Sequence, residues 1–271
     1  MIALRGHGLH GGAPASVRLV REAGAVRLRA GGAEARMAEL VLDGRDRSTS
    51  ATTRDGRIRV RTVEHLFAAL GALSIRDGVV IEIDGPEVPL LDGGARAWLD
   101  ALLSLGVDPS PTPLWVMRRG SIEVGPSRYE FHPPEHPNDI RIEVDVDFGD
   151  ARLERHARWE GGAADFYERI ALARTFGFDR DIGELLERGL ASHVAPESVV
   201  VIAFDEILSA GRPFSSDEPA RHKLLDLVGD LYAHGGPCVG SLRATRPGHA
   251  ATHEAIRRGL ESGLLMVTRT R

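Results

Sequence analysis

The stretch Asp108-Pro109-Ser110-Pro111-Thr112-Pro113 lies near the middle of the chain and decides how its 271 residues are organised. Three prolines at alternating positions disfavour both a helix and hydrogen-bonded pairing within a sheet. The stretch therefore predicts a linker between a first segment, residues 1–110, and a second segment, residues 113–271. Because domains run to roughly 100–200 residues, a chain of this length can form one large domain or two modest ones.

Outward from this linker, the two segments show a similar order of patterns. Alternating apolar and polar residues predict strands, and apolar residues three and four apart predict helices. In the first segment the predicted strands are 16–20, 25–28, 57–60 and 79–83, and the predicted helices are 63–73 and 95–105. In the second the strands are 115–118, 121–124, 128–131, 140–146 and 199–202, and the helices are 165–173, 182–188 and 220–233. We expect an α+β protein with two similar β-β-α-β-α lobes.

The composition excludes several classes of protein. The 39 acidic and 34 basic side chains give a net charge of −5, which argues against a nucleic-acid binder. Cys238 is the only cysteine, so no intramolecular disulfide can form and a reducing compartment is expected. The first residues lack the apolar core of a signal peptide, and no apolar run approaches the ~20 residues that span a bilayer. We expect a cytoplasmic monomer that binds no nucleic acid and has no stable membrane insertion.

The sharpest local signal is His222-Lys223-Leu224-Leu225-Asp226-Leu227-Val228-Gly229-Asp230. On a helix His222, Asp226 and Asp230 share one face, because residues four apart are neighbours. An imidazole and a carboxylate at this spacing can bind one metal ion from a single helix. The alternative is a solvated stripe that carries a His-Asp ion pair. Lys223 is the only lysine among the basic residues, which makes it a candidate for a task that a flat guanidinium cannot perform.

A second signal is Glu64-His65, which interrupts an otherwise apolar helix start in Thr62-Val63-Glu64-His65-Leu66. A buried charge without a partner would cost several kcal/mol, so these two polar residues require an explanation. His65 can supply a third metal ligand, with Glu64 beside it as a general base. The alternative is that Glu64 caps free N–H groups at the helix start.

Two further clusters hold candidate functional residues. His249 follows Pro247-Gly248 in what we expect to be a loop, where functional side chains are common. In Arg174-Thr175-Phe176-Gly177-Phe178, a hydroxyl and two aromatic rings flank a flexible glycine.

These motifs, together with Asp84-Gly85-Pro86-Glu87 and Gly8-Leu9-His10, occur in an order that resembles one known family over essentially the whole chain. The sequence is similar to UDP-3-O-acyl-N-acetylglucosamine deacetylase, the zinc amidase of lipid A biosynthesis in Gram-negative bacteria. The resemblance implies hydrolysis of the N-acetyl group of UDP-3-O-(3-hydroxyacyl)-N-acetylglucosamine, which yields acetate and a free 2-amino sugar. A UDP-acyl-sugar is then the small-molecule substrate, and Zn2+ is the cofactor.

The resemblance also implies a role for each candidate residue. His65, His222 and Asp226 would bind the zinc ion, and Glu64 would be the general base. Thr175 and a cationic His249 would stabilise the oxyanion, His249 would protonate the leaving amine, and Asp230 would orient His249. The substrate would contact Lys223 through its charge, and also Phe176, Phe178, His193 and Val194.

In the fold that the resemblance implies, each lobe is a mostly antiparallel sheet packed on two helices, and the helices are sandwiched between the outer sheets. A βαβ-like insert at about residues 178–208 would form the passage for the acyl chain, and residues 45–53 would form a smaller insert in the first lobe.

The sequence departs from the family pattern at several points. His193-Val194 stand where most relatives have glycines, which puts acceptance of a long acyl chain in question. Thr252-His253 replace the asparagines that usually follow the Gly-His pair. Two alternatives therefore stay open: a divergent paralogue that deacetylates another N-acetyl sugar, and a non-catalytic zinc-binding relative.

Overall fold

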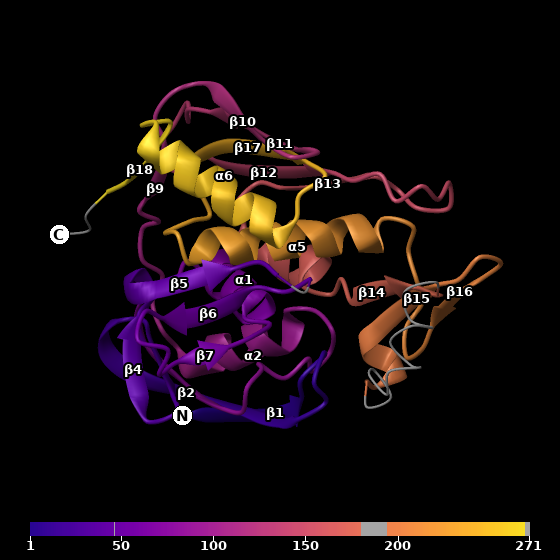
Figure 1. The fold of residues 1–271 in the computed structure, drawn as a ribbon, viewed down its shortest axis with the longest axis horizontal. Helices are drawn as coiled ribbons and strands as arrows, with labels where there is room; N and C mark the ends of the chain where they lie inside the picture. Colours follow the sequence, from indigo (N-terminus) through magenta and orange to yellow (C-terminus); the bar gives the residue numbers. More distant parts are fainter. Residues whose placement is uncertain (46, 180–193, 269–271) are drawn as a thin grey trace.

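The computed structural model describes residues 1–45, 47–179 and 194–268, and this part of the chain contains two five-stranded sheets (Figure 1). In both sheets the central strand runs antiparallel to one neighbour and parallel to the other, so the two sheets share one topology. The α+β class is confirmed. The first sheet has the order β1 (Ile2–His7), β2 (Pro14–Ala25), β8 (Asp77–Asp84), β3 (Arg27–Ala30), β4 (Ala33–Arg36); the second has the order β10 (Gly120–Val124), β11 (Ser127–His132), β17 (Gly240–Thr245), β12 (Ile140–Asp145), β13 (His156–Trp159).

Helices fill the space between the two sheets, as Figure 1 shows. They are α1 (Glu64–Ala72), α2 (Arg96–Leu105), α5 (Glu218–Tyr232) and α6 (His249–Glu261). Every residue of α1 is buried, which explains its nearly unbroken apolar sequence. The helix α2 has one apolar face and ends at Gly106, whose φ of 65° is the left-handed conformation in which glycine commonly ends a helix. The predicted helices at 63–73, 95–105 and 220–233 are confirmed.

The helices α1 and α5 approach each other closely at Gly229. A Cβ atom on Gly229 would lie 2.1 Å from the backbone oxygen of Glu64, which is far inside van der Waals contact. A side chain at this position would therefore separate the two helices. The absence of a side chain at Gly229 brings the start of α1, with Glu64 and His65, against the middle of α5.

Smaller elements surround this layered arrangement. A three-stranded sheet of β14 (Thr175–Phe178), β15 (Val199–Ile202) and β16 (Ile207–Ser209) lies at the side of the helices (Figure 1). A satellite apolar cluster beneath it contains Val200 and Ile202, with Phe176 and Phe178 packed against them. The other short elements are η1 (Met37–Glu39), β5 (Leu40–Asp43), β6 (Ser50–Thr53), β7 (Arg59–Val60), β9 (Leu114–Val116), α3 (Ala163–Asp165), η2 (Phe166–Ile170), η3 (Pro196–Ser198) and β18 (Leu265–Val267).

Three details of the predicted order of elements are wrong. Each five-stranded sheet has four strands before the first long helix of its segment, whereas the predicted β-β-α-β-α order has two, and β1, β4, β13 and β17 match no predicted strand. The strand β1 is only half-buried, so its apolar alternation is weak. The predicted helix 165–173 is instead a short turn of α-helix followed by a π-helical turn, in which the N–H of Ala171 donates to the oxygen of Phe166. His249 begins α6 rather than lying in a loop, because Gly248 is the N-cap residue of that helix.

The linker contains neither helix nor strand between Asp108 and Pro113, as its prolines predict. The division into domains at 1–110 and 113–271 stays a prediction. The predicted helix at 182–188 lies outside the described residues. Among the residues that the structure does describe, no helix has the length and apolar character needed to cross a membrane.

Candidate metal centre and active site

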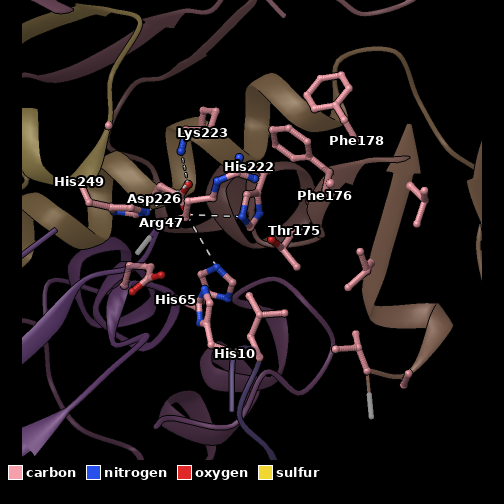
Figure 2. A pocket seen from close by; sticks show the side chains of 18 of the residues that line it. His10, Arg47, His65, Thr175, Phe176, Phe178, His222, Lys223, Asp226 and His249 are labelled. Carbon is pink, nitrogen blue, oxygen red and sulfur yellow. Dashed lines mark hydrogen bonds and ion pairs between the residues drawn. The ribbon is translucent and has the colours of Figure 1, made fainter. Parts of the chain in front are cut away.

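Three side chains from two helices converge on one buried point (Figure 2). His65 lies in the first turn of α1, while His222 and Asp226 lie one turn apart on α5. The Nε2 atoms of His65 and His222 lie 3.7 Å and 3.5 Å from Asp226 Oδ1. One nitrogen or oxygen atom of each residue can be chosen so that all three lie within 4.8 Å of one another, a spacing that fits ligands around a single metal ion. All three side chains are buried, so the solvated-stripe alternative is wrong.

The protonation of the two rings suits metal binding. The Nδ1 atom of His222 lies 3.0 Å from the carbonyl oxygen of Ala173, which can only accept a hydrogen bond. His222 therefore carries its proton on Nδ1, and Nε2 presents a lone pair toward Asp226. Burial lowers the pKa of His65 to about 3 and lowers that of His222, so both rings are neutral at pH 7. A neutral imidazole is the form that binds metals.

The two oxygens of Asp226 have different neighbours. While Oδ1 faces the two imidazoles, Oδ2 accepts a hydrogen bond of 2.7 Å from Lys223 Nζ. Burial favours the neutral acid, but the charge of Lys223 and the nearby His222 and His249 rings hold the pKa of Asp226 well below its ordinary value. Lys223 thus lies inside the candidate site, where the sequence analysis expected it to act on a substrate. The structure places its ammonium group on Asp226.

Glu64 is the first residue of α1, and its side chain is buried. The backbone N–H of Thr49 donates to its Oε2 over 3.0 Å. This contact comes from a neighbouring segment, which the capping interpretation does not account for. Burial raises the pKa of Glu64 to about 7, although the positive charge of His249 lowers it in part. A carboxylate with such a pKa can accept and release a proton near neutral pH.

His249 and Asp230 form a buried pair at the start of α6. His249 Nδ1 lies 3.0 Å and 2.9 Å from the two oxygens of Asp230. Burial disfavours a charged ring, but the carboxylate of Asp230 outweighs this effect and raises the pKa of His249 to about 9. The other ring nitrogen, Nε2, lies 4.0 Å from Asp226 Oδ2. An imidazolium ring is therefore held beside the candidate metal site.

A cavity of about 1140 Å³ connects these groups to the three-stranded insert sheet. Its polar end is lined by the residues described above, and its apolar end by side chains of β14 to β16 (Figure 2). The ring of Phe176, on β14, lies edge-on to that of His222, with centroids 6.0 Å apart. Phe176 therefore lies where the apolar end of the cavity meets the polar end. Of the predicted site residues, His193 lies outside the described residues, and Asp230 lies behind His249. The others line the cavity: Glu64, His65, Thr175, Phe176, Phe178, Val194, His222, Lys223, Asp226 and His249.

The fold also brings to the site several residues to which the sequence analysis assigned no role. Thr49 contacts both Glu64 and Asp230. Arg47 and His10 line the cavity, and Glu87 accepts hydrogen bonds from the ring and backbone N–H of His10. The Gly8-Leu9-His10 motif signalled His10, but no local pattern marks Thr49 or Arg47.

The fold and the site together define an α+β protein with a candidate mononuclear metal centre at the polar end of a deep apolar cavity. The chain belongs to the UDP-3-O-acyl N-acetylglycosamine deacetylase (LpxC) family, whose model matches residues 1–260. A UDP-3-O-acyl-N-acetylglucosamine deacetylase of Myxococcus xanthus is 37% identical over 228 residues, which cover 82% of this chain and 70% of that protein. A protein of the same name from Brucella melitensis biotype 2 is 35% identical over 267 residues, covering 94% of this chain and 91% of the relative.

Proposed function

We propose that this protein is a zinc-dependent hydrolase that removes the N-acetyl group of UDP-3-O-(3-hydroxyacyl)-N-acetylglucosamine in lipid A biosynthesis. One observation carries the proposal: a His-His-Asp cluster, a buried carboxylate and a buried imidazolium face the same end of a cavity whose other end is apolar. The polar end suits an amide bond, and the apolar end suits an acyl chain. Family membership supports the same reaction.

The donor set fits a zinc ion. Two neutral imidazole nitrogens and one carboxylate oxygen are ligands typical of catalytic zinc sites, which keep a further position open. His65, His222 and Asp226 would hold the ion. When bound, it would polarise the amide carbonyl and acidify a water molecule.

Two residues would move protons in this proposal. Glu64 would remove a proton from the attacking water, because its raised pKa places it near the solution pH. His249 would give the proton on Nε2 to the departing amine nitrogen, while Asp230 holds Nδ1 and favours the charged ring. The bond between the acetyl carbon and the sugar nitrogen breaks, and the products are acetate and the 2-amino sugar.

Other residues would bind the substrate. The hydroxyl of Thr175 and the charge of His249 would stabilise negative charge on the carbonyl oxygen during attack. Lys223 would orient Asp226 and contribute positive charge. Phe176, Phe178 and Val194 would contact the acyl chain. Cytoplasmic location, the monomeric state and the absence of a nucleic-acid partner stay predictions.

An acetate-release assay tests the proposed substrate. UDP-N-acetylglucosamine with a 3-O-acyl chain should be deacetylated at least tenfold more efficiently, in kcat/KM, than the same sugar without the chain. Equal efficiency would instead support the alternative of a divergent paralogue that acts on another N-acetyl sugar.

The Glu64→Gln variant tests the proposed base while it keeps the shape of the side chain. We expect zinc content to stay at about one per chain, while kcat falls roughly 10²–10⁴-fold, as loss of a general base predicts. A metal-free preparation with full activity would contradict zinc dependence. A zinc-loaded parent that deacetylates no N-acetyl sugar would support the non-catalytic alternative.

A further inference from the structure

Two histidines outside the proposed proton transfers extend the hydrogen-bond network behind the site. His253, on α6, is buried, and its Nδ1 atom lies 3.0 Å from Nε2 of His234, which follows α5. The other nitrogen of His253, Nε2, lies 3.1 Å from the hydroxyl oxygen of Thr49. That hydroxyl lies 2.6 Å from Asp230 Oδ1. A continuous chain of contacts thus runs from His234 to the carboxylate that holds His249.

The chemistry of the groups fixes the direction of this chain. An ionised Asp230 can only accept, so the hydroxyl of Thr49 uses its single proton to donate to Asp230. The Nε2 atom of His253 must then carry a proton and donate to the oxygen of Thr49. A neutral His253 has no proton on Nδ1, which therefore accepts from the Nε2–H group of His234.

The state of each group agrees with this direction. Burial lowers the pKa of His253 and lowers that of His234 to about 4, which makes both rings neutral at pH 7. Burial alone would favour a neutral Asp230, but the charge of His249 and hydrogen bonds from His249 and Thr49 lower its pKa. Every donor in the chain points toward Asp230.

We propose that Thr49, His253 and His234 are positioning residues, which fix the carboxylate of Asp230 and through it the ring of His249. Asp230 Oδ1 accepts from both His249 Nδ1 and the hydroxyl of Thr49, so loss of the hydroxyl leaves this oxygen with one fewer partner. The Thr49 oxygen also lies 3.3 Å from His249 Nδ1. The inference rests on the proposed function, because it assigns its effect to the reaction of His249.

Thr49 allows a clean test, because its contact with Glu64 uses the backbone and its contacts with Asp230, His253 and His249 use the hydroxyl. Its backbone N–H holds Glu64, and a side-chain substitution leaves that group in place. Thr49→Val replaces the hydroxyl by a methyl group of similar size, whereas Thr49→Ser keeps the hydroxyl. We expect kcat of Thr49→Val to fall about 10- to 100-fold, as for other residues that orient reacting groups, with KM changed less than about threefold. Thr49→Ser should recover most of the activity.

His253 allows a matched pair of variants on α6. His253→Leu removes the donor to Thr49, and His253→Gln keeps an N–H group near the position of Nε2. We expect Leu to lower kcat and Gln to restore much of it. The control is Thr252→Val, which lies next to His253 on α6 but loses a contact to the hydroxyl of Tyr129 instead. Thr252→Val can destabilise α6 but leaves the hydrogen-bond chain from His234 to Asp230 in place, so its kcat should stay near that of the parent.

Ring-nitrogen NMR of the zinc-loaded protein tests the hydrogen-bond chain directly and does not require an assay of enzymatic activity. We expect His253 and His234 to be neutral at pH 7, each with its proton on Nε2, and Thr49→Val to alter the Nε2 signal of His253. A proton on Nδ1 of His253, or a charged ring, would overturn the inference. An unchanged kcat in Thr49→Val would overturn it too, with the deacetylase proposal intact. A parent without deacetylase activity would contradict the proposed function, and the NMR signals would still decide whether the directed chain exists.

Discussion

The carboxylate of Asp226 divides its two oxygens between different partners, and this division gives Lys223 its place in the site. One oxygen faces His65 and His222, and the other holds the ammonium group. A compact ammonium group occupies this position from three residues away on the same helix. A guanidinium group is larger and flat, so it would not reproduce the contact at the same depth.

Lys223→Arg is expected to lower kcat/KM about tenfold or more, although the charge is preserved. The larger head group would shift Asp226 or protrude into the cavity. Steady-state kinetics on the acylated substrate measure the effect, and metal analysis of the same sample shows whether the ligands still bind zinc. Kinetics equal to those of the parent would mean that only the charge of Lys223 matters.

A second carboxylate, Glu87, contributes to stability rather than to chemistry. Burial opposes its ionisation, but hydrogen bonds from the His10 ring, the Thr62 hydroxyl and the backbone N–H groups of His10 and Gly11 lower its pKa to about 2. A pKa lowered from 4.5 in the unfolded chain stabilises the fold at any pH above about 4.5. This stabilisation is lost as the pH falls from about 4.5 to about 2.

We therefore expect Glu87→Gln to lower the free energy of unfolding at pH 7 by about 3 kcal/mol, since each pKa unit corresponds to ~1.4 kcal/mol. Urea unfolding at pH 7 and pH 3 measures the difference between parent and variant. The difference should shrink by more than half at pH 3, because the stabilisation that ionised Glu87 gives the parent falls between about pH 4.5 and pH 2. A difference that is independent of pH would assign the effect to packing.

At the scale of elements, the crossing of α1 and α5 determines where the site forms. Glu64 and His65 come from one helix and His222 and Asp226 from the other, and Gly229 sets the distance between them. Gly71 lies on the same contact, but a Cβ atom there would meet only side-chain atoms of Pro237, Val228 and Tyr232, none closer than 3.4 Å.

Gly229→Ala should destabilise the protein by several kcal/mol and weaken zinc binding, because the added methyl group collides with the backbone of Glu64. Gly71→Ala is the matched control and should change the unfolding free energy by less than about 1 kcal/mol. Urea unfolding and zinc titration measure both effects. Equal effects from the two alanines would show that the close approach at Gly229 is not limiting.

The same elements show what the sequence could predict. The helices α1, α2 and α5 were predicted within about two residues of their ends, because their apolar residues repeat at helical spacing and their faces are buried. The helix α6 was missed, since its sequence is largely polar and Pro247-Gly248 at its start suggested a loop. Thr49 could not be found at all: its importance arises from contacts with residues 15, 181 and 204 positions away. Local patterns carry no information about such contacts.

At the scale of the whole molecule, the candidate metal ligands join the two segments on either side of the linker. His65 belongs to residues 1–110, whereas His222 and Asp226 belong to residues 113–271. The apolar core is also continuous across this boundary, because one cluster includes Leu66 and Phe67 together with Leu224 and Leu225. A bound zinc ion would add a link between the same two parts, so its binding should stabilise the whole fold and not one segment alone.

Removal of zinc by a chelator should therefore lower the melting temperature in a single transition. A ligand at 100 times its dissociation constant stabilises a fold by about 2.7 kcal/mol, which corresponds to roughly 5–10 °C for a chain of this size. Calorimetry with and without zinc measures the shift, and His65→Ala should abolish it because only two of the three ligands remain. The control is His156, an exposed histidine on β13 that lies far from the cluster in the sequence. His156→Ala should keep the zinc-dependent shift in melting temperature. If zinc raised the melting temperature of the parent and of His65→Ala equally, the ion would be bound somewhere other than between α1 and α5.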